Sequence, residues 1–307
     1  MISVVIPLYN KEKQIANTLH SVLKQTFQNF EVIIVNDGST DNSVLEVGKV
    51  HDARIRVINQ ENAGVSVARN RGIEEAYYDL IAFLDADDEW KPKYLETQYN
   101  LYQKYPDCSV YGCNYEFKNI TGEIIKANIN KLPFDEEDGI LTNYFEVASC
   151  SHPPICSISI MVKKEAIRSI NGFPVGIKSG EDLLTWARLA IKECIAYSRN
   201  NLAIYRMSGS TEGLLEKRFD EKDNVTNELL KLYRENPSII GLNSFVFRWI
   251  RINYCICIDM KKKRSARIVI EKALKNHIKL FQSIVLWSLS LLPSSLLKYL
   301  YYKYHNR

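Results

Sequence analysis

Short apolar runs alternate with longer amphipathic stretches along the first hundred residues of the chain. The runs are rich in Val and Ile and too short for helices, so four buried strands are predicted at residues 3–8, 30–35, 55–58 and 80–84. The stretches between them place apolar side chains at helical spacing, which predicts three helices at residues 11–25, 41–51 and 65–77. Continuous apolar strands joined by helical crossovers indicate an α/β fold, with a mostly parallel central sheet flanked by helices.

The pattern changes twice farther along the chain. Residues 111–177 contain shorter strands and turns, and SGEDLLTWARLAIK, residues 179–192, then returns to helical spacing. CIAYSR and LAIYRM are predicted to be a last pair of strands, ending at Met207. We expect a domain over residues 1–210, with halves at 1–110 and 111–210, followed by a helical region over residues 211–307.

Polar loops follow each of the four predicted strands. Their sequences are PLYNKE, NDGSTDNS, NQENAGVSVARN and DADDEW. Ligands of open α/β sheets bind in the crevice outside the carboxyl ends of the strands. A purely structural set of loops would also be polar, but four loops from one sheet edge can face a single crevice.

The composition is that of an ordinary folded protein, with 46% hydrophobic and 25% charged residues in a chain of 307. No G-x-G-x-x-G or Walker sequence occurs, which argues against a dehydrogenase and a P-loop NTPase. The opening MISVVIPLYN has no cationic segment before its apolar run, so we expect no secretory signal and a cytoplasmic protein. The seven cysteines lack zinc-site spacing and are expected to be free thiols.

Asp85 and Asp87 stand two residues apart where the fourth predicted strand ends. Such a pair can offer carboxylate oxygens to Mg²⁺ or Mn²⁺, which use few protein ligands together with substrate phosphates. The cation would neutralise a departing diphosphate. The alternative is that Asp85, Asp87 and Asp88 are solvated turn residues. Trp90 is expected to start the next helix.

Five segments taken together carry a family resemblance: PLYN, VNDGSTDNS, NAGVSVARNRG, FLDADD and SGEDLLTWARL. In this order and spacing, over residues 2–207, they resemble the motifs of family 2 glycosyltransferases with the type A, Rossmann-like fold. The resemblance implies inverting, metal-dependent transfer from a nucleotide sugar, most simply a UDP-linked hexose or N-acetylhexosamine. It also implies surface-polysaccharide synthesis, of O-antigen or capsule.

The resemblance also implies roles for individual donor-site residues. Pro7 and Tyr9 would line the nucleoside pocket, with Tyr9 against the base, and Asp37 would hydrogen-bond the edge of the base. Arg69 would help to hold the donor near its diphosphate.

Three carboxylates are implied to serve the transfer itself. Asp85 and Asp87 match the family's D-x-D pair, with Asp87 the more direct metal ligand, and Asp182 matches the general base. An inverting transfer needs a carboxylate that takes the proton of the acceptor hydroxyl on the sugar face opposite the leaving nucleotide. The alternative for Glu181 and Asp182 is charge that complements a helix dipole.

The sequence departs from the family at two positions. Members often carry a histidine shortly after the terminal Tyr-Arg, where this chain has Ser208 and Ser210, so a third protein ligand to the metal is in doubt. The Q-x-x-R-W motif of processive synthases is absent, because Phe245 stands at the Gln position before Arg248 and Trp249. We therefore expect one sugar to be added per encounter.

The end of the chain is basic and apolar. Residues 248–307 carry 13 Lys/Arg against two acidic residues, a net charge of +11, whereas residues 1–247 carry 27 Lys/Arg and 34 Asp/Glu, a net charge of −7. Pro293 and several serines interrupt the apolar stretch, so interfacial helices on an anionic membrane are predicted rather than a spanning helix. A helical bundle packed on the body is the alternative. Nucleic acid is not an expected partner.

The resulting hypothesis is transfer of a single sugar to a saccharide acceptor on a polyprenyl diphosphate lipid. The protein would act peripherally on the inner face of the cytoplasmic membrane. Two alternatives stay open: a sugar nucleotidyltransferase, and a catalytically inactive, membrane-bound carbohydrate-binding subunit.

Overall fold

A computed structural model describes residues 1–207, 218–293 and 296 of the chain. It divides the chain into two compact units. The sheet unit comprises residues 1–176 and 181–209, and the helical unit comprises residues 177–180 and 210–307. The functional roles of these two parts of the chain stay predictions.

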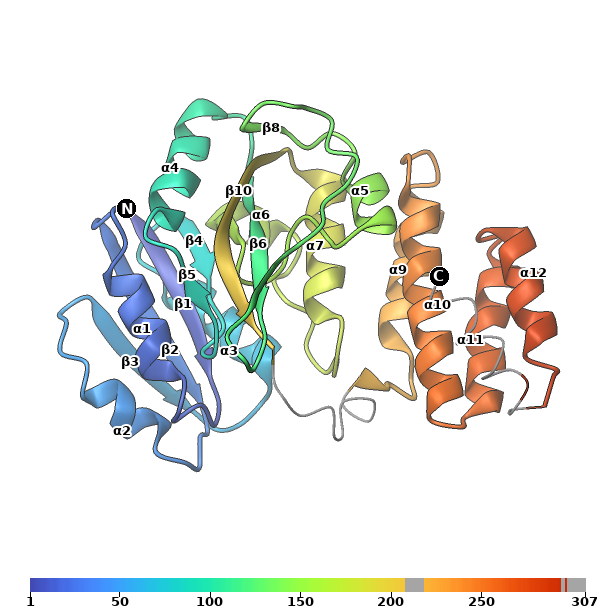
Figure 1. The fold of residues 1–307 in the computed structure, drawn as a ribbon, viewed down its shortest axis with the longest axis horizontal. Coiled ribbons are helices and arrows are strands. Elements are labelled where there is room, and N and C mark those ends of the chain that lie inside the picture. The colour runs from blue at the N-terminus through green and yellow to red at the C-terminus, as the bar shows by residue number, and fades with distance from the viewer. Residues whose placement is uncertain (208–217, 294–295, 297–307) are drawn as a thin grey trace. The chain divides into compact units, whose positions relative to one another are not determined.

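The sheet unit alternates strands and helices in its first half (Figure 1). Its strands are β1 (Ile2–Leu8), β2 (Phe30–Asp37), β3 (Ile55–Gln60), β4 (Leu80–Phe83), β5 (Glu89–Trp90), β6 (Val110–Lys118), β7 (Ile124–Lys126), β8 (Asp138–Ile140), β9 (Ile160–Lys163) and β10 (Ile195–Arg206). Its helices are α1 (Ile15–Leu23), α2 (Ser43–Gly48), α3 (Val65–Glu75), α4 (Tyr94–Lys104), α5 (Tyr144–Cys150), α6 (Lys164–Ser169) and α7 (Glu181–Lys192). The four strands predicted from the apolar runs are therefore all present.

All these strands belong to one sheet, in the order β3-β2-β1-β4-β9-β6-β10-β5, with β7 beside β6 and β8 beside β10. Strands β1 to β4 pair in parallel. Strand β9 runs antiparallel to both β4 and β6, and β10 is parallel to β6. Strands β1, β2, β3, β4, β6 and β10 thus point the same way, which confirms the predicted α/β fold.

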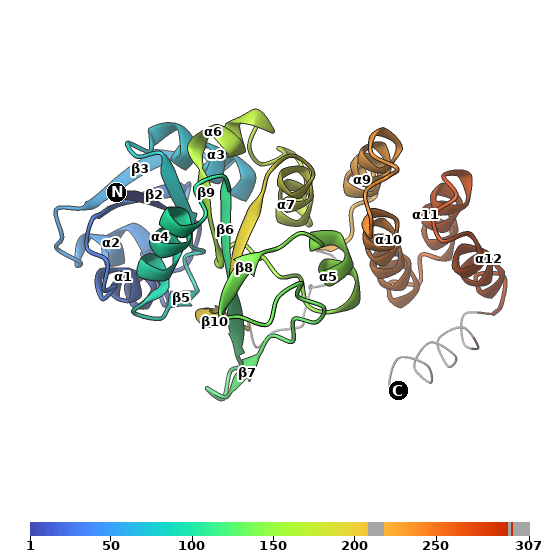
Figure 2. The ribbon, with the colours of Figure 1, turned by 90° about the horizontal axis from the view of Figure 1, so that it is seen from above.

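Alternate side chains of β1 enter two separate cores. Ile2, Val4 and Ile6 belong to a buried cluster with side chains of α1, α2 and α4. The other face carries Val5, which meets α3 at Gly72. Helices therefore cover both faces of the sheet, as Figure 2 shows with α1, α2 and α4 on one side and α3 and α6 on the other.

Three details differ from the prediction. The expected last pair of strands is one continuous strand, β10, which passes irregularly through Asn201 where the polar residues suggested a break. Trp90 lies in β5 instead of starting a helix, and its buried ring stacks on Tyr94 with centroids 4.0 Å apart. Cys108 and Cys194 are joined in a disulfide, so the expectation of seven free thiols is wrong for this pair.

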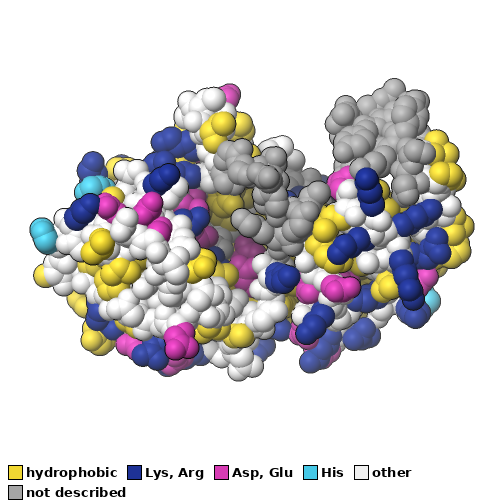
Figure 3. Space-filling model, turned by 90° about the horizontal axis from the view of Figure 1, so that it is seen from below, with side chains coloured by type: hydrophobic (Ala, Val, Ile, Leu, Met, Phe, Trp, Pro, Cys, Tyr) yellow, Lys and Arg dark blue, Asp and Glu magenta, His cyan; other side chains and the backbone are white. Residues whose placement is uncertain are grey.

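The helical unit contains α9 (Asn224–Glu235), α10 (Leu242–Asp259), α11 (Lys263–Lys275) and α12 (Leu280–Leu289). Helix α10 packs against α9 and α11, and α11 packs against α12. Lys and Arg side chains gather over these helices on the face drawn in Figure 3. Within residues 1–207 and 218–293, no helix is long and apolar enough to cross a membrane.

Candidate active site

The loops after β1 and β2 are held together by side chains. The Asn10 side-chain oxygen accepts the backbone N–H of Thr40 at 2.8 Å, and the N–H of Lys11 donates to Ser43 Oγ at 2.7 Å. Asn10 has a left-handed backbone, φ 51°, which an asparagine tolerates better than most residues. Beside it, Tyr9 is 47% exposed while Pro7 is half-buried in β1. The ring of Tyr9 is therefore free to meet a planar ligand at this edge of the sheet.

Asp37 lies at the end of β2 and is almost completely buried. Its carboxylate accepts hydrogen bonds from the Gln60 side chain at 2.7 Å and from the backbone N–H groups of Ala63 and Gly64 at 2.9 Å. Asp37 thus fixes the loop between β3 and α3, and its predicted contact with a base stays a prediction.

The two carboxylates of the predicted D-x-D pair each contact a different cation. Nη2 of Arg69 donates to Asp85 Oδ1 at 2.8 Å, and the ammonium of Lys11 forms an ion pair with Asp87 Oδ2. The side chains of Asp85 and Asp87 are 26% and 33% exposed. These carboxylates are therefore partly screened by the protein's own cations and partly open to a ligand.

The next acidic residue, Asp88, is not a solvated turn residue. It is buried, and its Oδ1 accepts the backbone N–H of Arg206 at 2.7 Å. Burial and then the charges of Asp85 and Asp87 raise the pKa of Asp88 well above its ordinary value. Asp88 therefore attaches the acidic loop to the end of β10.

Arg69 connects the D-x-D pair to the start of α7. Its Nη1 donates to Glu181 Oε1 at 3.1 Å while Nη2 contacts Asp85, and the guanidinium lies 5.1 Å from the centroid of the Phe173 ring. The Arg69 side chain is 3% exposed. Burial opposes its charge, but the surrounding carboxylates outweigh burial and raise the pKa of Arg69.

Asp182 occupies the first turn of α7, where the helix dipole favours negative charge. Its Oδ1 accepts the N–H of Leu183 at 2.7 Å, and its Oδ2 lies 3.5 Å from the hydroxyl of Ser157. Burial and then the charge of Asp182 raise the pKa of Glu181 to about 7, against the effect of Arg69. Glu181 is therefore a partner of Arg69, and Asp182 is the carboxylate without a cationic side chain of its own among the described residues.

The carboxylates of Asp85 and Asp87 fit a hard divalent cation. Each keeps a second oxygen that makes no hydrogen bond within the described part of the chain, and oxygen is the ligand that Mg²⁺ and Mn²⁺ prefer. In residues 1–207, 218–293 and 296, no group of three or more His, Cys, Asp or Glu could hold a metal. The remaining ligands would then come from water and a bound diphosphate. Ser208 and Ser210, discussed for a third ligand, lie outside the described residues.

The structure brings together Asp85, Arg69 and the Glu181–Asp182 pair, which are all predicted from motifs, and it adds two contacts that were not predicted. These are the ion pair of Lys11 with Asp87 and that of Arg69 with Glu181. Lys11 stands within the PLYNKE loop and Glu181 within the SGEDLL segment. The sequence motifs therefore marked the two segments, but they did not indicate which residues Lys11 and Glu181 contact.

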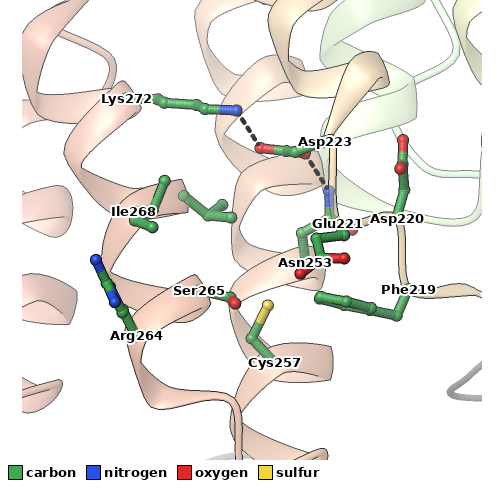
Figure 4. A pocket seen from close by; sticks show the side chains of 11 residues that line it. Phe219, Asp220, Glu221, Asp223, Asn253, Cys257, Arg264, Ser265, Ile268 and Lys272 are labelled. Atoms are coloured by element: carbon green, nitrogen blue, oxygen red, sulfur yellow. Dashed lines mark hydrogen bonds and ion pairs between the residues drawn. The ribbon is translucent and has the colours of Figure 1, made fainter.

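A separate cavity of about 320 Å³ lies within the helical unit (Figure 4). Lys272 donates to the buried carboxylate of Asp223 at 2.8 Å, and the side chain of Asn253 donates to it at 3.2 Å. The carboxylate of Asp223, directly before α9, thus joins α11 through an ion pair and α10 through a hydrogen bond. None of the predicted site residues lines this cavity, and we interpret its polar groups as part of the packing of the helices.

Comparison with known proteins identifies the family. The family described as "Glycosyl transferase family 2" matches residues 3–163, which include the loops after β1 and β2 and the D-x-D pair. The chain belongs to glycosyltransferase family 2. TuaG of Bacillus subtilis, named as a teichuronic acid biosynthesis glycosyltransferase, is 34% identical to it over 211 residues, covering 67% of this chain and 79% of TuaG.

Two further relatives of this glycosyltransferase are matched over a smaller part of their length. WfgD of Escherichia coli, named UDP-Glc:α-D-GlcNAc-diphosphoundecaprenol β-1,3-glucosyltransferase, is 38% identical over 139 residues, covering 43% of this chain and 54% of WfgD. Glycosyltransferase GlyA of Streptococcus pneumoniae is 31% identical over 228 residues, covering 72% of this chain and 32% of GlyA. The chain thus spans about half of WfgD and a third of GlyA.

Solved structures show the same fold. S. aureus TarS 1–349 in complex with UDP-GlcNAc superposes with a TM-score of 0.69 at 18% identity, covering 94% of this chain and 90% of that chain. The mannosyltransferase PcManGT from Pyrobaculum calidifontis, in complex with GDP-Man and Mn²⁺, superposes with a TM-score of 0.58 at 17% identity, covering 93% and 79%. At these identities the likeness concerns the fold alone.

Proposed function

We propose that this glycosyltransferase moves one sugar, with inversion, from a UDP-linked donor to a saccharide acceptor. The acceptor is carried by a polyprenyl diphosphate lipid and serves the synthesis of a cell-surface polysaccharide such as an O-antigen or capsule. The observation that carries the proposal is the position of Arg69, whose two Nη atoms contact Asp85 of the D-x-D pair and Glu181 beside Asp182. One buried guanidinium therefore joins Asp85 to Glu181, the neighbour of the candidate base in the sequence.

Asp182 is the general base of the proposed reaction. It accepts the proton of the acceptor hydroxyl while that oxygen attacks the anomeric carbon and the bond to the nucleoside diphosphate breaks. Arg69 pairs with Asp85 and Glu181, whereas Asp182 has no ion pair within the described residues and is the carboxylate available to take the proton. The hydroxyl of Ser157, 3.5 Å from Asp182 Oδ2, helps to orient the carboxylate.

The donor is held by the loops at the carboxyl ends of the strands. Tyr9 and Pro7 contact the nucleoside, and Asp37, which holds the loop between β3 and α3, meets the edge of the base. Asp85 and Asp87 would hold Mn²⁺ or Mg²⁺, which would supply positive charge to the leaving diphosphate. A UDP donor is supported by the UDP-GlcNAc bound in TarS and by the UDP-glucose in the name of WfgD.

The proposed location is the inner face of the cytoplasmic membrane, with the helical unit on the lipid. Four apolar side chains of α12 are exposed at positions that recur along one side of a helix: Leu280, Phe281, Ile284 and Val285. Phe281 is 77% exposed. Basic residues of α11 and the following turn, among them Lys275 and Lys279, stand near this stripe in the sequence. An apolar stripe beside basic side chains is typical of binding to an anionic lipid surface.

The donor and the metal are tested by incubating the purified protein with UDP-, GDP- and dTDP-sugars in Mn²⁺, Mg²⁺ or EDTA. We expect slow, metal-dependent release of UDP that Asp87→Ala abolishes. A protein that binds and hydrolyses none of these donors would contradict the donor-site assignment. Formation of a nucleotide sugar from a nucleoside triphosphate and a sugar phosphate would instead favour a nucleotidyltransferase.

The base is tested by Asp182→Asn in a transfer assay with a lipid-linked saccharide. We expect a fall in turnover of about 10² to 10⁴, the usual contribution of a general base, with unchanged UDP affinity. Ser157→Ala is the control and should lower turnover by a smaller factor. Equal activity of Asp182→Asn and the unaltered protein would refute its role, and a carbohydrate-binding subunit would show no transfer in either.

The membrane surface is tested by sedimentation with vesicles of phosphatidylglycerol or of phosphatidylcholine. We expect binding to the anionic vesicles that falls with added salt and is lost in the double variant Phe281→Glu, Ile284→Glu. Leu45→Glu on α2, which also alters a largely exposed apolar residue, is the matched control. An equal loss of vesicle binding in the double variant and in Leu45→Glu would argue against α12 as the lipid-binding helix.

A further inference from the structure

Lys11 contacts the carboxylate that the donor metal would use. Its ammonium forms an ion pair with Asp87 Oδ2, although Lys11 lies in the loop after β1 and Asp87 in the loop after β4. The backbone N–H of Lys11 donates to Ser43 Oγ at 2.7 Å, so the root of this side chain is fixed. Its outer end is not enclosed, because the side chain is 36% exposed.

The other cation at the D-x-D pair is held differently. Arg69 is 3% exposed and donates to Asp85 and Glu181 through separate Nη atoms, so it is enclosed and has two carboxylate partners. Within the described residues Lys11 has one carboxylate partner, and its four-carbon side chain can rotate. Lys11 is therefore the cation of this site that can change partner without disturbing the core.

A divalent cation and the Lys11 ammonium repel each other when both lie on Asp87. A metal that binds Asp87 must therefore displace the ammonium or lose affinity to it. A displaced ammonium needs a new anionic partner, and a donor whose diphosphate shares the metal brings one next to Asp87. An ammonium is a common ligand of phosphate oxygens because it donates in several directions.

We propose that Lys11 changes partner during donor binding, from the Asp87 carboxylate to the diphosphate of the metal-bound nucleotide sugar. The inference rests on the proposed function, because it needs a metal and a diphosphate at this place. While it is paired with Asp87, Lys11 keeps the acidic loop partly neutral and lowers its affinity for free metal. With donor present, Lys11 adds to the binding of the diphosphate and helps to balance the charge of the leaving group.

The two roles of Lys11 predict opposite changes in two binding measurements. Lys11→Met removes the charge and keeps an unbranched side chain, and Lys13→Met does the same at an exposed residue of the same loop. Mn²⁺ binding without nucleotide is measured by the loss of the free-ion electron paramagnetic resonance signal. UDP binding at saturating Mn²⁺ is measured by calorimetry.

For Lys11→Met we expect Mn²⁺ to bind about fivefold tighter, since a partly exposed ion pair competes only modestly. We expect UDP to bind about tenfold more weakly at saturating Mn²⁺, the size of a lost charge-assisted hydrogen bond. Lys13→Met should change neither affinity. Lys11→Gln should reproduce both changes, which guards against an effect of the methionine side chain.

Mn²⁺ binding no tighter in Lys11→Met than in Lys13→Met, or an unchanged affinity for UDP, overturns the inference. Weakening of both affinities also overturns it, because that result indicates general damage to the site. The proposed function has its own separate outcome: it fails when the unaltered protein binds no UDP in Mn²⁺. When the unaltered protein binds UDP and metal, and Lys11→Met has the same affinities as Lys13→Met, only the role of Lys11 is refuted.

Discussion

Arg69 donates to Asp85 across 2.8 Å from a side chain that is only 3% exposed. Asp85 is nearer the solvent, so the pair has a buried positive end and an accessible negative end. The acidic residues around it outnumber Arg69 and Lys11, because Asp87 and the Glu181–Asp182 pair lie in the same network of contacts. Such a local excess of negative charge attracts a divalent cation.

Replacing Arg69 by Ala is expected to destabilise the protein by about 3 to 5 kcal/mol, because it leaves Asp85 and Glu181 without their buried cation. Urea unfolding followed by circular dichroism measures this change. Arg71→Ala is the control on the same helix, since Arg71 is 54% exposed and pairs with Glu75 at the surface, where the expected loss is below about 1 kcal/mol. Similar losses in both variants would contradict a structural role for the Arg69 network.

The fold was predictable where apolar runs determine a strand. The side chains of β1, β2 and β4 are nearly all buried, and burial on both faces leaves an unbroken apolar run in the sequence. In β10 the same logic failed. Arg199, Asn200 and Asn201 suggest a turn, but the strand continues because its pairing with β6 resumes after a register shift. Pairing with a distant strand outweighed the local polar signal.

The site was predictable as a set of loops and not as a set of contacts. The motifs marked Asp85, Asp87 and Asp182, whereas the partners of these regions come from far along the chain. Lys11 and Asp87 are separated by 76 residues, and Arg69 and Glu181 by 112. No local pattern encodes such a pairing, because it depends on how the carboxyl ends of several strands meet at one edge of the sheet.

Asp37→Ala is expected to destabilise the protein by about 1 to 3 kcal/mol and to weaken UDP binding. The reason is that the N–H groups of Ala63 and Gly64 lose their acceptor, and hydrogen bonds to a charged group contribute about 1.5 to 3 kcal/mol. Urea unfolding and calorimetric titration with UDP measure the two effects. Glu61→Ala changes an exposed acidic residue of the same loop and should alter neither. If Asp37→Ala is as stable as Glu61→Ala, Asp37 does not hold this loop.

Gly72→Ala is expected to destabilise the protein because α3 lies directly on β1. A methyl group on Gly72 would be 2.2 Å from Cγ1 of Val5, and overpacking of this kind costs about 1 to 3 kcal/mol. Gly48→Ala is the control, since nothing lies within 4 Å of its added methyl. In the double variant with Val5→Ala, the loss caused by Gly72→Ala should shrink. Additive losses would show that the contact with Val5 is not the cause.

The pKa of Glu181 predicts how the stability of the protein depends on pH. Burial and the charge of Asp182 raise this pKa from 4.5 to about 7, so the folded protein holds the Glu181 proton more tightly than the unfolded chain does. The resulting stabilisation is fully present below pH 4.5 and is lost as the pH rises through 7. The expected loss is on the order of 3 kcal/mol.

Urea unfolding of the unaltered protein and of Glu181→Gln between pH 4.5 and 8 isolates this effect. Gln does not titrate, so the stability of the unaltered protein relative to Glu181→Gln should fall steadily between pH 4.5 and 7 and then stay level. The weaker contact of the glutamine with Arg69 lowers the unfolding free energy of Glu181→Gln by the same amount at every pH, so it does not change the dependence on pH. In Asp182→Asn the fall should be smaller, because removing the neighbouring charge lowers the pKa of Glu181. If the unfolding free energies of the unaltered protein and Glu181→Gln change with pH in the same way, the prediction is wrong. Glu181 would then ionise in the folded protein as readily as in the unfolded chain.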